Sequence, residues 1–335
     1  MIIKVAMNGL GSVNTNLLSI IKLKKYELRR DYDIEFKIVC ISDSSGVAIN
    51  ENGFDAVEIC LRKEDGEKAQ NFIGYKPDMS MEEALAAIEC DLLFEGSPVD
   101  HKTGGAALQI TRNALMGGIS VVLANKGPVV CAQRELHKLA AENNAQIKYS
   151  ATVCGGLPVL NIGERDMIAA DIHKIRGVFN GTSNFIFAAM IRGQKFADAL
   201  KVAQEVGAAE ADPSLDIDGW DTAFKLLIIA NSVLKADISL DNIEIEGISA
   251  ITPEMLRTEY EAGNTIKLVA TAENGVYTVK PTVLAREGFL GSCDGWEMGV
   301  EIHSDIYGIS YHKLYEKEPI PTAASMMRDA VNIFS

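Results

Sequence analysis

Carboxylates cluster just ahead of one lysine-bearing segment in the second half of the sequence, and acidic side chains beside an ammonium can bind a polar substrate or exchange protons with it. Gly207 follows an apolar-periodic segment and marks a helix end, and Pro213 is unfavourable inside a helix. The carboxylates of Glu210, Asp212 and Asp216 are therefore predicted to lie on a loop.

The lysine of this stretch, Lys225, follows Asp221 by four residues. Apolar spacing predicts a helix from Trp220 to Leu234, with Asp218 as its N-cap, so Asp221 and Lys225 lie one turn apart on it. One interpretation is an exposed ion pair that stabilises the helix by about 0.2–0.5 kcal/mol. The other is a partly buried ammonium that donates a proton or a hydrogen bond to a substrate oxygen.

The first residues show the pattern of a dinucleotide-binding unit. An apolar run over 2–7 is followed by Gly9 and Gly11 and then by a helical pattern that begins at Ser12 and Val13. Gly9 permits the tight turn, and Gly11 lets a pyrophosphate approach the backbone amides at the helix start. Asn14 stands at the third glycine position. The alternative is a simple turn between a strand and a helix.

The second predicted strand ends at Ser42, Asp43 and Ser44, where such folds contact the adenosine ribose. Asp43 could accept a hydrogen bond from a 2′-hydroxyl, which would favour NAD(H). The serines, with Arg62 and Lys63 nearby, could hold a 2′-phosphate, which would favour NADP(H). Both cofactors stay open, and we favour NADP(H).

Two further predicted strands end in candidate ligand contacts. Gly96 and Ser97 follow the strand over 90–94 and could touch the nicotinamide end, and Lys126 follows the strand over 119–123. Ligands of open α/β sheets bind beyond the carboxyl ends of the strands. Lys126 could therefore act on substrate or cofactor, or it could be a solvated lysine in a turn.

Two loops of the middle region could reach a ligand. Glycines and a proline over 150–158 indicate a crossing between domains, where backbone carbonyls could face a ligand or a cation. Cys154 is weighed as a nucleophile, although no histidine is close to it in sequence. The polar turn over 180–184 could cap the helix that follows it or contact a ligand.

Composition excludes several classes of function. A net charge of −14 argues against nucleic acid and anionic membranes as partners. No apolar run approaches the roughly 20 residues of a membrane span, and no secretion signal is recognised, so we expect a cytoplasmic protein. Six scattered cysteines without a C-x-x-C pair indicate free thiols.

The order of elements predicts an α/β fold with two domains. Strands that alternate with helices predict a Rossmann-type doubly wound parallel sheet in residues 1–133, which residues 320–335 rejoin as a final helix over 322–333. Consecutive strands, with a hairpin turn at Asn274 and Gly275, predict an α+β domain with a mixed sheet in residues 134–319. Its faces could support a homodimer.

The chain resembles homoserine dehydrogenase of the monofunctional kind over nearly its whole length. The motifs that carry the resemblance are the G-x-G turn at Gly9 and Gly11, A-N-K at 124–126, A-T-V-x-G-G-x-P at 151–158, N-G-T-x-N at 180–184 and, most specifically, E-x-D-P-x-x-D-x-x-G-x-D-x-x-x-K at 210–225.

The resemblance implies NAD(P)H-dependent reduction of aspartate 4-semialdehyde to homoserine, a reversible step of threonine and methionine biosynthesis. It implies catalytic roles for Lys225, Lys126 and Asp221. Members of the family also bind a monovalent cation, Na⁺ or K⁺, through a glutamate and carbonyls. It implies a substrate site for a small amino acid that contains Glu210, Asp216, Gly181 and Thr182.

Two departures from the family pattern stand out. Ser150 replaces the expected glutamate, which leaves the carbonyls of Val153 and Gly155 as cation ligands, and residues 315–320 lack the usual glycine-rich turn. No regulatory ACT domain is expected after the last helix. Two alternatives stay open: a semialdehyde dehydrogenase that uses Cys154 as its nucleophile, and a dinucleotide sensor without catalysis.

Overall fold

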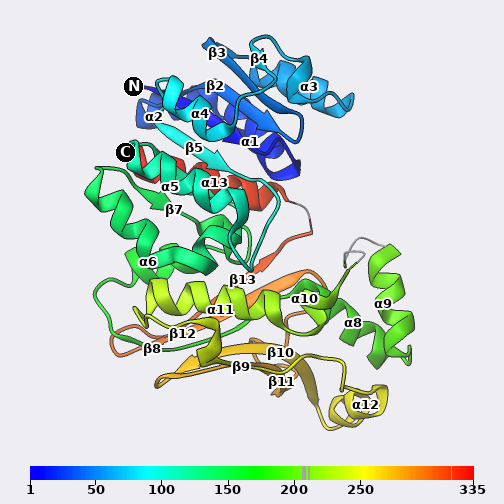
Figure 1. Ribbon diagram of the computed structural model, residues 1–335. Coiled ribbons are helices and arrows are strands. Elements are labelled where there is room, and N and C mark those ends of the chain that lie inside the picture. The colour runs from blue at the N-terminus through cyan, green and yellow to red at the C-terminus, as the bar shows by residue number, and fades with distance from the viewer. Residues whose placement is uncertain (206–208, 210–211, 318) are drawn as a thin grey trace. The chain divides into compact units, whose positions relative to one another are not determined.

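The computed structural model describes residues 1–205, 209, 212–317 and 319–335, whose helices and strands are shown in Figure 1. The chain divides into two compact units, the first comprising Met1–Gly156 and Glu318–Ser335 and the second Leu157–Lys317. The division lies later in the chain than the predicted boundary after residue 133, which falls inside a helix. Among the described helices, none has the length and apolar character needed to cross a membrane.

The first unit contains a seven-stranded sheet with the order β4-β3-β2-β1-β5-β6-β7. Its strands are β1 (Ile2–Asn8), β2 (Glu35–Asp43), β3 (Gly46–Phe54), β4 (Tyr75–Lys76), β5 (Leu92–Glu95), β6 (Ser120–Leu123) and β7 (Ile147–Lys148). The five neighbouring strands β2, β1, β5, β6 and β7 all pair in parallel, which confirms the predicted doubly wound sheet. β3 and β4 add an antiparallel edge that the sequence did not predict.

The helices of the first unit are α1 (Ser12–Leu23), α2 (Lys25–Tyr32), α3 (Ala56–Glu64), α4 (Met81–Ala87), α5 (Gly105–Met116), α6 (Lys126–Glu142) and α13 (Ile320–Phe334). The helix predicted over 322–333 is therefore confirmed as α13. It packs against α1, and Leu17 and Leu18 of α1 share one buried core with Met326 and Ala330 of α13. Segments from both ends of the sequence thus build the same hydrophobic core.

The second unit contains a six-stranded mixed sheet with the order β13-β12-β8-β10-β11-β9. Its strands are β8 (Ile172–Val178), β9 (Ile243–Ile245), β10 (Asn264–Glu273), β11 (Val276–Ala285), β12 (Glu297–Ser304) and β13 (Gly308–Tyr315). β9 pairs in parallel with β11, and the other pairs are antiparallel. Asn274 and Gly275, with φ of 50° and 77°, form the predicted hairpin turn.

The helices of the second unit are α7 (Val159–Asn161), α8 (Gly181–Ile191), α9 (Phe196–Glu205), α10 (Ser214–Ile217), α11 (Trp220–Val233) and α12 (Pro253–Glu261). α11 packs on β9, β10 and β11, and buried apolar side chains such as Phe224, Leu227 and Ile228 occur at helical spacing along it. α11 lies along the sheet in Figure 1. The sheet therefore fixes the helix that carries the predicted lysine.

Candidate functional site

Lys225 and Asp221 form an ion pair on α11, with 2.7 Å between Nζ and Oδ2. Their side chains are only 13% and 15% exposed, so the pair is largely withdrawn from water. Nζ of Lys225 also donates a hydrogen bond to the carbonyl oxygen of Phe179, at 2.7 Å. These acceptors from two elements fix the direction of the ammonium, and the interpretation as an exposed surface pair is excluded.

Asp216, on α10, accepts hydrogen bonds from two neutral side chains, one of which also contacts the ion pair, and together these residues form a cluster. Nδ2 of Asn180 donates to Oδ1 of Asp216 at 2.6 Å and to Oδ2 of Asp221 at 3.5 Å. The hydroxyl of Thr182 donates to Oδ2 of Asp216 at 2.8 Å. Oδ1 of Asn180 accepts from the amide of Ser183 and so caps α8. Asn180 therefore has the predicted role as a cap, and it also contacts both carboxylates of the cluster.

Two local predictions in this region are wrong. Asp216 lies in the short helix α10 and not on a loop. Pro213 does not prevent this helix, because it stands at the N-cap, where its missing N–H costs no hydrogen bond within the helix. Asp218 does not cap α11, since Gly219, in the left-handed conformation with φ of 84°, is the N-cap. The glycine allows the sharp turn between the two helices, which brings Asp216 close to Asp221.

The cluster carries two carboxylates and one ammonium, so its formal charge is negative. Burial, and after it the negative charge of Asp221, raises the pKa of Asp216 above its usual range. A cationic group of a ligand would relieve this repulsion and form charge-assisted hydrogen bonds. Chemically, the cluster can hold an ammonium and direct a hydrogen-bond donor, Lys225, at a neighbouring oxygen.

The other predicted substrate residues are Glu210 and Gly181. Glu210 lies outside the described residues. Gly181 is the first residue of α8, next to Asn180, and a Cβ added to it would lie 3.7 Å from the ring of Trp296. Gly181 and Thr182 thus both belong to the turn that holds Asp216.

In the first unit, the glycine turn joins β1 to α1 as predicted. Gly9 has φ of 82°, and a Cβ on it would lie 2.6 Å from Cα of Ser97, so only glycine suits this position. A Cβ on Gly11 would meet no described atom within 4 Å, and no described side chain caps α1. The amides of Ser12 and Val13 at the helix start can therefore face an anionic group.

Asn14, at the third glycine position, is fully buried at 0% exposure. Its Nδ2 donates to the carbonyl oxygens of Asn8 and Gly9, both at 3.0 Å. A Cβ on Gly96 would lie 2.8 Å from the same nitrogen. The asparagine ties the turn to β1 and packs against the loop after β5, which explains how the unit forms without a third glycine.

A buried hydrogen-bond network crosses the carboxyl ends of β2, β1 and β5. The hydroxyl of Ser42 donates to Oδ1 of Asn8, and Nδ2 of Asn8 donates to Oε2 of Glu95, both at 2.6 Å. The amide and the hydroxyl of Ser97 donate to Oε1 of Glu95, whose pKa is raised by burial. Asn8 and Glu95 are not among the predicted site residues, although each is a polar residue at the end of an apolar strand.

Lys126 begins α6, just beyond the carboxyl end of β6, and the residue before it anchors the turn. Oδ1 of Asn125 accepts from the amide of Gly127 at 2.9 Å and caps the helix. Nδ2 of Asn125 donates to the carbonyls of Ser97 and Pro98, both at 3.1 Å. The turn that holds Lys126 is thus joined to the loop after β5.

Asp43 lies at the end of β2, with its side chain 10% exposed. Oδ1 accepts from the amide and the hydroxyl of Ser45, and Oδ2 accepts from the amide of Ala69 and from Nζ of Lys63, all within 3.0 Å. Burial opposes ionisation of Asp43, but these hydrogen bonds outweigh it and lower the pKa. Ser44 is exposed in the turn between β2 and β3.

The segment around Ser150 is held by α13. The buried carboxylate of Asp329 accepts from the amide and the hydroxyl of Ser150, at 2.8 and 2.6 Å. The carbonyl oxygen of Gly155 accepts from the hydroxyl of Ser325 at 2.9 Å, and Val153 is fully buried. The polar groups of this segment are thus engaged within the first unit.

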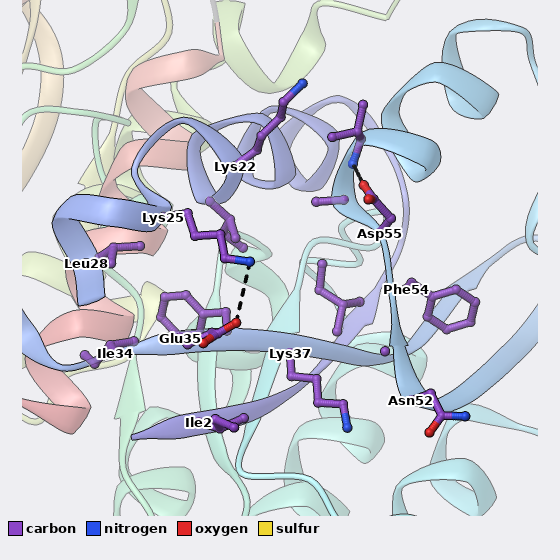
Figure 2. A pocket seen from close by; sticks show the side chains of 16 residues that line it. Ile2, Lys22, Lys25, Leu28, Ile34, Glu35, Lys37, Asn52, Phe54 and Asp55 are labelled. Carbon is purple, nitrogen blue, oxygen red and sulfur yellow. Dashed lines mark hydrogen bonds and ion pairs between the residues drawn. The ribbon is translucent and has the colours of Figure 1, made fainter. Parts of the chain in front are cut away.

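A pocket of about 480 Å³ lies elsewhere in the first unit, between α1, α2, the start of β2 and the start of α3. Figure 2 shows its charged rim, where Lys25 pairs with Glu35 at 3.5 Å and Lys22 and Lys37 also carry positive charge. The pocket borders the amino-terminal half of β2, whereas parallel sheets bind ligands beyond the carboxyl ends of their strands. None of the predicted site residues lines it, and we assign it no role in catalysis.

Comparison with known proteins shows the family of this chain. Residues 158–331 match the family model of homoserine dehydrogenase. The chain is 31% identical to the homoserine dehydrogenase of Methanocaldococcus jannaschii, over 98% of this chain and 97% of the relative. It is 30% identical to an NAD(+)-dependent homoserine dehydrogenase of Pseudomonas canavaninivorans, over 91% of this chain and 88% of the relative.

A solved structure has the same fold. The hyperthermophilic archaeal homoserine dehydrogenase in complex with NADPH superposes with a TM-score of 0.85 at 28% identity, covering 99% of this chain and 98% of that one. Both the sequence and the fold of this protein therefore match those enzymes over almost their full length. The chain belongs to the homoserine dehydrogenase family of NAD(P)-dependent oxidoreductases.

Proposed function

We propose that this protein interconverts aspartate 4-semialdehyde and homoserine, as a step of threonine and methionine biosynthesis. The observation that carries the proposal is the cluster of Asp216, Asp221, Lys225 and Asn180, whose charges suit a substrate with one ammonium and one reacting oxygen. A sensor without catalysis has no chemical need for an oriented lysine among partly buried carboxylates.

In the proposed mechanism, Lys225 donates a proton to the substrate oxygen as the aldehyde becomes an alcohol, and accepts it in the reverse direction. The bound nicotinamide supplies or accepts the hydride. Asp221 and the carbonyl of Phe179 orient Nζ of Lys225. Asp216 binds the substrate ammonium, a role that Glu210 is predicted to share. Lys126 is the second candidate for the proton transfer.

The first unit supplies the residues proposed to hold the dinucleotide. The open space at Gly11 and the amides of Ser12 and Val13 suit the pyrophosphate. Gly96 and Ser97, ordered by the network around Glu95, are proposed to border the nicotinamide. The NADPH complex of the archaeal enzyme supports this class of cofactor.

We further propose a preference for NADP(H). The carboxylate oxygens of Asp43 are already engaged by Ser45, Ala69 and Lys63, which leaves little capacity for a ribose 2′-hydroxyl. Lys63 offsets the negative charge that would repel a 2′-phosphate. Arg62 contributes less, because Glu58 and Glu67 hold its guanidinium.

Replacement Lys63→Ala should lower the ratio of kcat/KM for NADPH to kcat/KM for NADH by about 10-fold, the scale of one charge-assisted contact at a partly exposed site. In the variant the negative charge of Asp43 is no longer offset by Lys63, and this charge repels a ribose 2′-phosphate. Lys76→Ala, at an exposed lysine of β4, is the control and should keep the ratio. An unchanged ratio in Lys63→Ala would remove Lys63 from cofactor selection.

A monovalent cation remains a prediction. The described residues hold no group of three or more His, Cys, Asp or Glu side chains that could bind a metal ion. Ser150 offers no carboxylate, Asp329 is engaged by Ser150, and the carbonyl of Gly155 is engaged by Ser325. These residues fit a cation poorly, so no step of the mechanism is assigned to one.

Cys154→Ser should retain activity within about threefold of the parent, which separates this proposal from a thiol mechanism. Cys154 is 1% exposed and therefore poorly placed to attack a substrate. The measurement is steady-state turnover of aspartate 4-semialdehyde by both proteins. Loss of turnover by 10²-fold or more, with folding intact, would favour the cysteine-dependent dehydrogenase instead.

The experiment that tests the whole proposal follows oxidation of NADPH and NADH, separately, with aspartate 4-semialdehyde as substrate. We expect turnover with both and a higher kcat/KM with NADPH. Cofactor binding without turnover of either the semialdehyde or homoserine would support the sensor. A homodimer and a cytoplasmic location also stay predictions, and sedimentation of the purified protein tests the first.

A further inference from the structure

A second pocket of about 310 Å³ lies in the second unit, at the carboxyl end of α8. Its wall is built from the last turn of α8, the start of β10 and the segment over 291–294 that precedes β12. β10 pairs with β8 from Ala270 to Glu273, so Thr265 and Lys267 lie beyond this pairing. The volume is sufficient for a small organic ligand.

Lys267 is the unusual member of this wall, because a lysine that is 5% exposed faces the pocket. Lysine is almost never fully buried unless an acceptor pairs with it. Within the described chain, Nζ of Lys267 makes no hydrogen bond or ion pair, unlike Lys313 nearby, which contacts Ser292 and Glu297. The pocket is therefore lined by a largely buried lysine whose ammonium has no acceptor among the described residues.

Two guanidinium groups add to the positive charge around this donor. Arg192, the C-cap of α8, and Arg286, whose guanidinium lies 4.4 Å from the ring centre of Tyr260, both line the pocket. Asp294 is the acidic residue of the lining, and its carboxylate accepts from the amide of Gly295. Three cationic side chains face one carboxylate, so the lining has an excess of positive charge.

We propose that this pocket binds a small dianion, a dicarboxylate or a phosphate, with Lys267 at its base and Arg192 and Arg286 at its rim. Arginine can bind two oxygens of a carboxylate or of a phosphate by parallel hydrogen bonds, and the lysine provides a point charge. Burial lowers the pKa of Lys267, partly offset by Asp294, and a bound anion would favour the charged form again. The pocket is separate from the cluster of Asp216, Asp221 and Lys225 and does not depend on the proposed reaction.

The test is calorimetric titration of the whole protein, without substrate, with succinate, inorganic phosphate and acetate in separate runs. We expect saturable binding of succinate, phosphate or both, with Kd of roughly 1 mM or tighter, and weaker binding of the monoanion acetate. Saturation by succinate alone identifies a carboxylate ligand, and saturation by phosphate alone identifies a phosphate ligand.

Lys267→Met and Arg286→Gln should each weaken this binding about 10-fold or more, as expected for loss of a charged hydrogen-bond donor. Lys280→Met, at an exposed lysine on the neighbouring β11, is the matched control and should bind as the parent does. Lys267→Met replaces an unpaired buried charge with an apolar chain, so its Tm should equal or exceed that of the parent.

Three outcomes would overturn the proposal. The first is the absence of saturable binding of either dianion up to roughly 20 mM. The second is binding that neither Lys267→Met nor Arg286→Gln weakens, which would place the anion elsewhere. The third is equal weakening by Lys280→Met, which would indicate attraction by overall charge.

Discussion

Lys225→Ala is expected to lower kcat for aspartate 4-semialdehyde by roughly 10²-fold or more, the loss expected when a positioned proton donor is removed. The dissociation constants of NADPH and NADH should stay within about twofold of the parent, because the residues proposed to hold the dinucleotide belong to the first unit. Steady-state kinetics and fluorescence titration of the cofactor separate the two effects.

The control for this variant is Lys201→Ala. Lys201 pairs with Glu205 four residues later, at 4.0 Å, but its side chain is 75% exposed. Both substitutions remove a lysine from an ion pair of helical spacing, and they differ in burial. A kcat of Lys225→Ala within threefold of the parent would contradict the role of Lys225 and direct attention to Lys126.

Asp216→Asn is expected to raise KM for the amino-acid substrate by about 10- to 100-fold, as for loss of a charge-assisted hydrogen bond, with a smaller change in kcat. The substitution keeps the size of the side chain and one of its two acceptor oxygens, so it removes the charge and one of the hydrogen bonds from Asn180 and Thr182. Asp212→Asn provides the control, because Asp212 is exposed and its described hydrogen bonds come from Ser214, the residue two positions later. An unchanged KM in Asp216→Asn would rule out its contact with the substrate ammonium.

The pH dependence of kcat/KM offers a second test of Asp216. Its pKa is raised by burial and by the charge of Asp221, so its negative charge is lost as pH falls through this raised value. The acid limb of kcat/KM should therefore lie above the usual range of an aspartate. Asp221→Asn removes the second cause and should shift the limb to lower pH, whatever it does to the maximal rate.

The sequence predicted the site of the second unit well where spacing along one helix was sufficient. The interval between Asp221 and Lys225 fixes their contact on α11, because four residues make about one turn. The contact of Asn180 with Asp216 could not be derived from spacing, since it depends on the fold that brings the start of α8 beside α10. Only the polar composition of the turn indicated that it mattered.

The first unit shows the same limit. The strand, glycine turn and helix were predictable because each has a local signal. The hydrogen bonds of Asn14 were not, because the asparagine replaces a glycine through contacts with β1 and the loop after β5. The choice between NAD(H) and NADP(H) at Asp43 could not be predicted for a related reason. Lys63 lies 20 residues from Asp43, and their pairing is set by packing of α3.

The position of α13 has a consequence for how the chain folds during synthesis. Met326 and Ala330 belong to the same buried core as Leu17 and Leu18, and Asp329 holds the segment at Ser150. A ribosome makes the chain from its amino terminus, so the nascent dinucleotide-binding unit exposes part of its apolar core until residues 320–334 emerge. The second unit is translated before residues 320–334 and can fold first, and the first unit closes only after these residues have emerged.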